Sequence, residues 1–301
     1  MAPLFQQPFM SGGFPSMNRA AAGLTRGVFG GGYEGTFSNI IDYITIASTG
    51  NATDFGDLTV ARTNTSTGYD ATRGVFAGGA TASSSNVIDY ITILTTGNAT
   101  DFGDLNNSVA NTGSVHSDVR SCHAGGNDGT VNVIDYITIA TTGNATDFGD
   151  LSANRSHITS DVNSVTRGVF CGGYDGSVNV NIMEYITIAT TGNATDFGDL
   201  LSSTRSCGGT TNLIRGIIAG DVGPSNVIQY ITIATTGNAT DFGDLTTSRS
   251  YPGGVTNNIR ACFGGGSSSN VIDYITIDST GNATDFGDLT RSPIDPGGVS
   301  G

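Results

Sequence analysis

Six copies of the tetrad Asp-Phe-Gly-Asp are the first candidates for chemistry in this chain. They begin at Asp54, Asp101, Asp147, Asp196, Asp241 and Asp285. An aspartate of such a triplet can hold magnesium for phosphoryl transfer, but only beside a glycine-rich phosphate loop, a strand lysine and a catalytic loop. The chain has none of these companions and contains no lysine. We therefore interpret each tetrad as a turn acid followed by a core aromatic.

The run "NATDFGD" around each tetrad also offers oxygen ligands. Calcium takes six to eight oxygens, usually from a loop with D-x-D-x-D spacing, and that spacing is missing here. We expect the side chains to cap the turn, with Asn144 bonding its own backbone, as asparagine commonly does beside a glycine such as Gly143. A bound cation in these turns stays open as the alternative.

Histidine and cysteine give a weak metal signal. His116 and His157 fall on predicted inner strands and could approach each other, but two histidines without a third ligand make a poor site, and we interpret them, with His123, as polar lining. The cysteines lack C-x-x-C spacing, so we expect small buried hydrophobic side chains at Cys122, Cys171, Cys207 and Cys262. We predict no metal site and no cofactor. No nucleophile, base and orienting partner recur together, which favours a protein that is not an enzyme.

A repeat of 44 to 49 residues must position all these side chains, because the tetrads recur at that interval. A second marker keeps the same period: an arginine opens each short apolar run such as "RGVFCGG", at Arg26, Arg73, Arg120, Arg167, Arg215 and Arg260. A period of this length indicates a repeat architecture.

Each repeat predicts four short strands, roughly "SHITSDV", "GVFCGG", "NIMEYITIA" and "DFGDL" in the fourth copy. The third run is rich in Val, Ile, Tyr and Thr, and its apolar residues fall on both sides of the pleat, so both faces of the sheet need cover. Such sheets cover one another by stacking or by closing into a ring. The first and last copies do not look like caps, which predicts an all-β, six-bladed β-propeller with four antiparallel strands per blade.

The repeat resembles the kelch family of β-propellers. A strand ends in a glycine pair, as at Gly172 and Gly173, and a strand with a tyrosine follows, as at Tyr185. Phenylalanine stands where kelch repeats usually carry tryptophan, at Phe55, Phe102, Phe148, Phe197, Phe242 and Phe286. The fifth copy departs from the pattern, with Asp221 in place of one glycine. The wording "YITIATTGNATDFGDLT" is also similar to kelch-type repeat proteins of marine bacteriophages, especially those of cyanobacteria.

We predict an extended N-terminal arm at 1–18 and a propeller at 19–301, with blades at about 19–58, 59–105, 106–151, 152–200, 201–245 and 246–289. The segment 290–301 would close the ring, because "RSPIDPGGVSG" echoes "RSYPGGVTN" of the sixth repeat and places Gly297–Ser300 as the inner strand of blade one. Ala20–Thr25 compete for that place.

The predicted arm is apolar but interrupted by proline and glycine, which suits an extended segment. It is either a loose tail or an arm that docks on a neighbour, and we favour docking through Leu4, Phe5, Phe9, Met10 and Phe14. The loops after the glycine pairs differ in every copy and collect on the face opposite the "TTGNAT" turns, and binding usually lies in such loops. Tyr33, Asp128 and Tyr174 are the candidate ligand-binding residues there.

Charge limits the partners. Twenty-six acids face twelve arginines, for a net charge of −14. Such a surface repels phosphate backbones and anionic lipid, so we expect neither nucleic acid nor membrane as a partner. The combined pattern favours a virion structural protein, a capsid decoration or tail accessory held to other virion proteins by its arm. The alternative is a propeller that adsorbs to host-surface carbohydrate through its variable loops.

Overall fold

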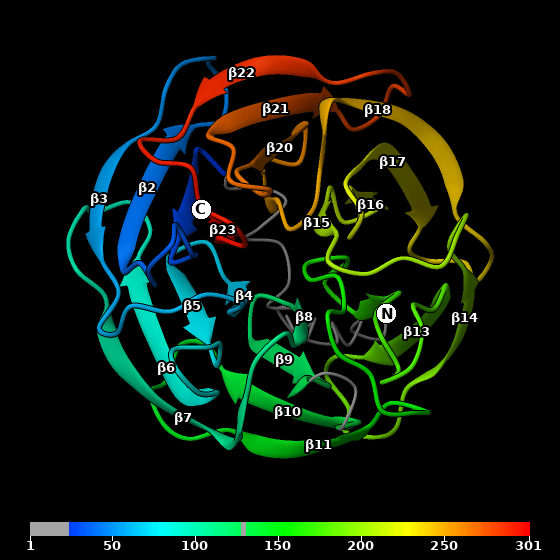
Figure 1. Ribbon diagram of the computed structural model, residues 1–301. Helices are drawn as coiled ribbons and strands as arrows, with labels where there is room; N and C mark the ends of the chain where they lie inside the picture. Colours follow the sequence, from blue (N-terminus) through cyan, green and yellow to red (C-terminus); the bar gives the residue numbers. More distant parts are fainter. Residues whose placement is uncertain (1–23, 128–130) are drawn as a thin grey trace, which may run out of the picture.

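The structure, a computed structural model, describes residues 24–127 and 131–301. In this part of the chain the strands form six antiparallel sheets, which stand around a common axis as the blades of a propeller (Figure 1). Five sheets have four strands and one has three. The predicted fold class, an all-β six-bladed β-propeller, is therefore confirmed. The predicted arm lies outside the described residues.

In blades two to six the strands follow one another outward from the axis in chain order, whereas in blade one the last strand of the chain takes the inner position. The inner strands are β4 (Ser66–Tyr69), β8 (Gly113–His116), β15 (Gly208–Thr211), β19 (Gly253–Thr256) and β23 (Gly297–Ser300). The second strands are β1 (Arg26–Gly30), β5 (Arg73–Ala77), β9 (Arg120–Ala124), β12 (Arg167–Cys171), β16 (Arg215–Ala219) and β20 (Arg260–Gly264). The third strands are β2 (Ile40–Thr45), β6 (Ser85–Thr92), β10 (Val133–Thr138), β13 (Ile182–Thr187), β17 (Ser225–Thr232) and β21 (Val271–Thr276). The outer strands are β3 (Thr53–Asp57), β7 (Thr100–Val109), β11 (Thr146–Asp150), β14 (Thr195–Asp199), β18 (Thr240–Arg249) and β22 (Thr284–Asp288).

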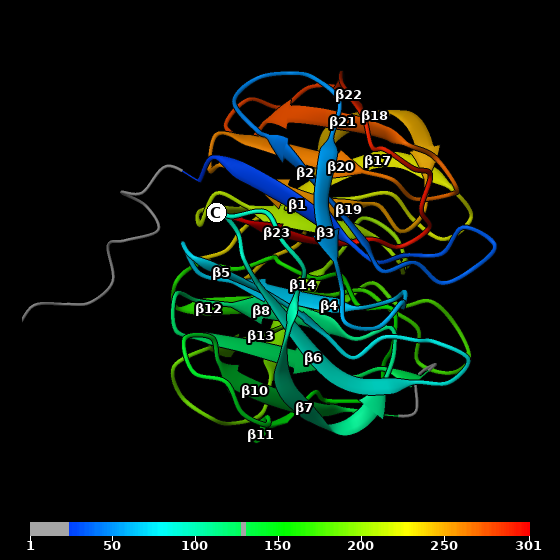
Figure 2. The same ribbon diagram turned by 90° about the vertical axis from the view of Figure 1, so that its left-hand side faces the viewer.

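The two ends of the described chain close the ring by sharing one sheet. Strand β23 pairs antiparallel with β1, with Val299 opposite Val28, and it takes the inner position of blade one. The backbone amides of Thr25 and Arg26 both donate to the carbonyl of Gly301. The C-terminal segment therefore fills the place for which Ala20–Thr25 competed in the sequence. Figure 2 shows the C-terminus beside the start of β1.

The fourth blade departs from the four-stranded prediction. The segment "SHITSDV" does not form a regular inner strand there, and β12, β13 and β14 make a three-stranded sheet. Thr159 bridges Cys171 and Asn163 bridges Gly168, so the inner segment advances by four residues while its neighbour advances by three. The extra residue makes a bulge, in which Asp161 takes a left-handed conformation with φ of 63°. The bulge, rather than a weak apolar pattern, breaks the ladder.

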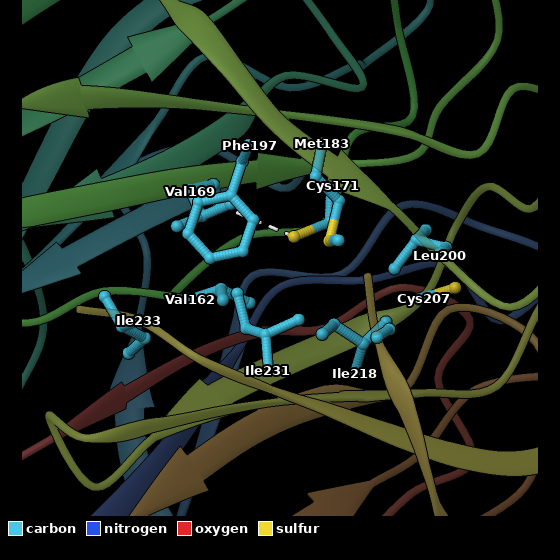
Figure 3. Close-up of a cluster of buried hydrophobic side chains, with 11 residues drawn as sticks. Val162, Val169, Cys171, Met183, Phe197, Leu200, Cys207, Ile218, Ile231 and Ile233 are labelled. Atoms are coloured by element: carbon cyan, nitrogen blue, oxygen red, sulfur yellow. Dashed lines mark hydrogen bonds between the residues drawn. The ribbon is translucent and has the colours of Figure 1, made fainter. Parts of the chain in front are cut away.

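Neighbouring sheets cover each other's apolar faces, as the two-sided third strands predict. In each blade the third-strand tyrosine packs edge-on against the outer-strand phenylalanine, with ring centroids 5.9–6.2 Å apart. Those six phenylalanines are buried. Figure 3 shows the interface between blades four and five, where Val162, Val169, Cys171, Met183 and Phe197 face Ile218, Ile231 and Ile233.

The repeated "TTGNAT" turns hold each blade to the previous one. In blade two, the amides of Gly97 and Ala99 donate to the carbonyls of Phe55 and Asp57 in the outer strand of blade one, at 2.8 and 2.7 Å. Asn98 accepts from the Asp57 amide through Oδ1. The same three bonds recur at all six junctions. The prediction that this asparagine bonds its own backbone is therefore wrong, because the facing outer strand presents a free N–H within its reach.

The glycine of each tetrad makes this contact possible. A Cβ on Gly103 would lie 2.5 Å from the carbonyl of Gly143 in the next blade's turn, and Gly103 has φ of 142°. Only glycine fits a backbone that close and in that conformation. The turn and tetrad sequences are therefore the same in every repeat, because the turn of each blade packs against the outer strand of the previous blade.

The arginine marker serves the same junctions. Each marker guanidinium lies over the tyrosine of its own blade, 4.2–4.8 Å from the ring centroid. Each also donates to a backbone carbonyl at the end of the third strand in the following blade; Arg73, for example, donates to Ile139. Each marker arginine thus stabilises its own blade through the tyrosine ring and the junction to the following blade through a hydrogen bond.

Buried ion pairs join four of the six outer connections to the following blade's third strand. They are Arg62 with Asp89, Arg155 with Glu184, Arg249 with Asp273, and Arg291 with Asp42. Burial raises the pKa of Asp42 and Asp89, while the facing arginines and threonines oppose that shift. Val109 and Thr204 replace the arginine in the other two connections, and there Asp135 accepts from Asn106 and Gln229 accepts from Leu201.

No helix within residues 24–127 and 131–301 has the length and apolar content needed to cross a bilayer.

Candidate functional site

The propeller has two unlike faces. We call the face that carries the "TTGNAT" turns and the hairpins between first and second strands the turn face. We call the opposite face, which carries the loops after the glycine pairs and after "DFGDL", the loop face. Because β1 begins and β23 ends at the turn face, both ends of the described chain lie there (Figure 2).

A pocket opens on the loop face at the axis, where the six connections into the inner strands converge. It leaves about 60 Å³ of space for water. One residue from each connection lies in its wall, six positions after the leucine of "DFGDL". These residues, which we call the rim ring, are Asn64, Asn111, His157, Ser206, Tyr251 and Asp295.

All six rim-ring residues have left-handed backbones, with φ between 54° and 61°. Asparagine and aspartate tolerate this conformation, but it is uncommon for serine and tyrosine. Backbone hydrogen bonds around the axis hold it: His157 donates to Asn111, Ser206 to His157, and Tyr251 to Ser206, at 2.7–3.0 Å. The backbone therefore repeats around the ring, whereas the side chains do not.

Side chains link part of the ring. Asn64 donates through Nδ2 to Oδ1 of Asn111. The rings of His157 and Tyr251 meet edge to face with centroids 6.2 Å apart, across the small Ser206. The rim is thus divided into an amide pair, an aromatic pair and a carboxyl.

That carboxyl belongs to Asp295, which is partly buried. It makes no hydrogen bond or ion pair with the side chains that the structure describes, and burial alone raises its pKa to about 7. A buried carboxylate without a partner is unfavourable, so such groups mark candidate binding sites.

Hydroxyls below and within the rim ring also lack partners. Thr65, Thr112 and Ser206 line the pocket, are more than nine-tenths buried, and have no hydrogen-bond partner for their side-chain oxygen among residues 24–127 and 131–301. The Thr65 hydroxyl would lie 2.7 Å from a Cβ on Gly297, which also lines the pocket. Hydroxyls buried in this way are satisfied only by something inside the pocket.

The bulge of blade four brings a second carboxylate to the pocket wall. Thr67 donates to Oδ2 of Asp161 at 2.9 Å, and His116 Nδ1 lies 3.1 Å from Oδ1. The ring of His116 packs on Tyr69 with centroids 4.0 Å apart, and both are buried. Asp161 therefore ties the inner segments of blades two, three and four together across the axis.

The histidines have separate roles. His157 lies in the rim ring, whereas His116 contacts Asp161 and Tyr69. His123 is buried between the hydroxyls of Ser66 and Ser121, and burial lowers its pKa to about 4. In the described ranges 24–127 and 131–301, no three His, Cys, Asp or Glu side chains lie together in a way that could hold a metal ion.

The four cysteines are free and buried. Burial raises the thiol pKa to about 12 at Cys122, Cys207 and Cys262, and raises it further at Cys171. The thiols are therefore protonated and behave as small apolar side chains.

Of the sequence-predicted loop residues, Tyr33 and Tyr174 do not line the axial pocket. Tyr33 is exposed and packs edge-on against Phe37, with centroids 5.4 Å apart. The guanidinium of Arg205 lies over Tyr174, 4.5 Å from its centroid. Asp128 and the arm residues Leu4, Phe5, Phe9, Met10 and Phe14 lie outside the described residues. Of these candidates the structure describes Tyr33 and Tyr174, and it gives no contact between them.

Sequence reasoning missed the rim ring, although a signal was present. The position six residues after the leucine of "DFGDL" has constant spacing in all six copies, yet its residue type changes almost every time. The constant spacing at this position is therefore the signal by which the rim ring could have been found.

No protein-family model matches the chain, and a search of curated proteins gives no match. The class of the protein, a six-bladed β-propeller, therefore comes from its fold.

Proposed function

We propose that the chain is a non-enzymatic structural protein of a virion, a capsid decoration or tail accessory, whose propeller is an exposed head. The observation that carries this proposal is the separation of the two faces. The described chain begins at Leu24 on the turn face, and the variable loops lie on the opposite face. Attachment through the turn face would leave the variable loops exposed, which suits a displayed head.

The interblade contacts support a durable head. Hydrogen bonds from the turns run around the outer edge of the propeller. They include the junction between blades six and one, where Gly50 donates to Phe286 and Ala52 to Asp288. The ring is therefore closed in two places, by these bonds at the outer strands and by the pairing of β23 with β1 near the axis. Such closure leaves no free junction at which unfolding could start.

The charge distribution supports protein rather than nucleic acid partners. Ten of the twelve arginines lie over third-strand tyrosines or pair with buried acids, and Arg205 stacks on Tyr174. The acidic excess of the chain is therefore left to the surface, and such a surface does not attract phosphate. The similarity of the repeat wording to kelch-type proteins of marine phages favours a virion location.

Deleting residues 1–18 tests the proposal. The truncated chain should keep the circular dichroism spectrum and melting temperature of the full chain, because the described fold begins at Leu24. It should be lost from purified particles assembled with the variant gene. A finer variant replaces Phe5, Phe9 and Phe14 with serine and should also be lost from particles.

A matched control replaces Val178, an exposed apolar residue of the loop face, with serine. This variant should enter particles as the full chain does. Normal incorporation of the truncated chain would rule out the arm as the anchor, and absence of the full chain from particles would rule out the virion role.

The axial pocket favours a second candidate function, which is binding of carbohydrate at the loop face. Three buried hydroxyls without partners and the aromatic pair of His157 and Tyr251 are suited to a polar, ring-shaped ligand. Binding of the isolated propeller to a glycan array, and loss of that binding on Tyr251→Ala, would support this function. An empty array would oppose it.

A further inference from the structure

We propose that the axial pocket binds a primary ammonium group, with Asp295 as its counter-ion and the hydroxyls of Thr65 and Ser206 as further acceptors. This inference concerns the propeller alone. It does not depend on the virion role, and either can fail without the other.

The sign of the ligand follows from the pocket wall. Asp161 and Asp295 line it, and no arginine lies among the lining residues that the structure describes. An anion would meet two carboxylates without a fixed positive charge, which excludes phosphate and carboxylate ligands. His157 is the one lining group that could acquire a positive charge, and it lies across the ring from Asp295.

The number of donors follows from the empty acceptors. An ammonium group has three N–H donors, and the pocket presents the Asp295 carboxyl and the hydroxyls of Thr65, Thr112 and Ser206 without partners in the described chain. Asp161 already contacts Thr67 and His116, so we count it as a negative charge that attracts the ammonium group and not as one of its hydrogen-bond acceptors. A divalent cation needs more carboxylate or imidazole ligands than the described pocket brings together.

The size of the ligand's inserted part follows from the cavity. About 60 Å³ of water-accessible space holds roughly four to five water molecules. That is enough for an aminomethyl or amino group with its first carbon atoms, and the rest of the ligand would lie on the rim beside Tyr251 and His157.

The rim ring explains why this chemistry appears once in a sixfold repeat. All six ring positions have the same backbone, but Asp295 is the one carboxylate among them. The site is therefore assembled from six different blades and is asymmetric, so one ligand binds per propeller.

Two kinds of ligand carry the same ammonium group: an amino sugar on a surface glycan and a free aliphatic amine. Titration calorimetry of the full chain would use D-glucosamine for the first and 1,4-diaminobutane for the second, with glucose and N-acetylglucosamine as neutral controls. We expect saturable one-to-one binding of at least one amine, at least about tenfold tighter than either neutral sugar. Whichever amine binds more tightly identifies the source.

Asp295→Asn should weaken amine binding by at least about tenfold, because it removes the charge and keeps the shape. Asp175→Asn is the matched control, since Asp175 is an exposed carboxylate of the loop face and its amide counterpart can still accept from Ser177 and Val178. It should change affinity less than about twofold. Thr65→Val, which removes one acceptor at constant volume, should weaken binding about threefold and provides a second test.

Binding of both glucosamine and 1,4-diaminobutane no tighter than that of glucose would overturn the proposal in favour of hydroxyl recognition. No binding of either amine at 50-fold excess over protein at millimolar concentration, or unchanged affinity in a folded Asp295→Asn variant, would overturn it outright.

Discussion

The turn face and the rim ring are both repeated six times, but they differ in what is repeated. At the turn face the side chains themselves recur, because each asparagine and glycine contacts the matching strand of the next blade. In the rim ring the backbone conformation recurs and the side chains change. Residues that are identical in all six copies therefore mark contacts between blades, whereas the rim-ring position keeps its backbone conformation and is free to vary in side chain.

The buried ion pairs lie between these two regions and give the largest expected effect. Arg249→Val leaves Asp273 buried without its charge partner, which should lower the free energy of unfolding by about 3–5 kcal/mol. Urea denaturation followed by circular dichroism measures this. Arg205→Val is the control, because Arg205 stacks on Tyr174 and forms no ion pair with the part of the chain described, and we expect about 1 kcal/mol. Equal losses would show that charge pairing does not stabilise the junctions.

The tetrad glycine tests the close approach of turn and strand. Gly103→Ala should lower the free energy of unfolding by about 3 kcal/mol, since it adds both a clash with Gly143 and backbone strain. Gly143→Ala provides the contrast: its φ is 153°, but a Cβ there meets nothing within 4 Å. We expect about 1–2 kcal/mol from strain alone. If the two variants melt at the same temperature, the interblade contact is not what requires glycine.

The asparagine of the turn should give a smaller loss. Asn144→Ala removes the acceptor for the Asp104 amide, which lowers the free energy of unfolding by about 1 kcal/mol. Hydrogen exchange of the Asp104 amide should become faster in the variant, while that of Asp57, which is bonded to Asn98, should not change. Uniform acceleration at both amides would contradict a local role.

The substitution of Asp295 should change stability in the opposite direction. Its pKa is raised to about 7 from an ordinary 3.8, so the folded chain holds this proton more tightly than the unfolded chain. Its contribution to stability therefore falls as pH rises from about 4 to about 7, and the loss is complete above pH 7. Asp295→Asn should be more stable than the parent by about 1–2 kcal/mol at pH 8 and equal to it near pH 4. A variant less stable at pH 8 would show that the carboxylate supports the fold rather than a ligand.

The effect of Asp295→Asn on stability also sharpens the comparison of the two regions. Turn-face substitutions should only destabilise, because each removes a contact between blades. A rim-ring substitution that stabilises the free protein and weakens amine binding would mark a residue kept for binding.

Much of the fold was predictable from particular residues. The tetrads and the marker arginines set six repeats, the two-sided third strands required face-to-face cover, and the echo between Arg249–Asn257 and the C-terminal tail pointed to β23. Less of the candidate site was predictable. Tyr33 and Tyr174 were candidates because of their residue type. The pocket is instead lined by Asp295 and the other rim-ring residues, whose individual types do not indicate a site.

The number of blades and the residues of the core follow from the sequence, because the period of apolar and aromatic residues dictates which surfaces must be buried. Tertiary structure alone decided that Asn144 bonds a neighbouring strand, that an extra residue in blade four turns Asp161 toward the axis, and that six distant residues form one ring. The physical reason is that burial is a property of each repeat, whereas hydrogen bonds and pockets depend on which repeats the closed ring brings together.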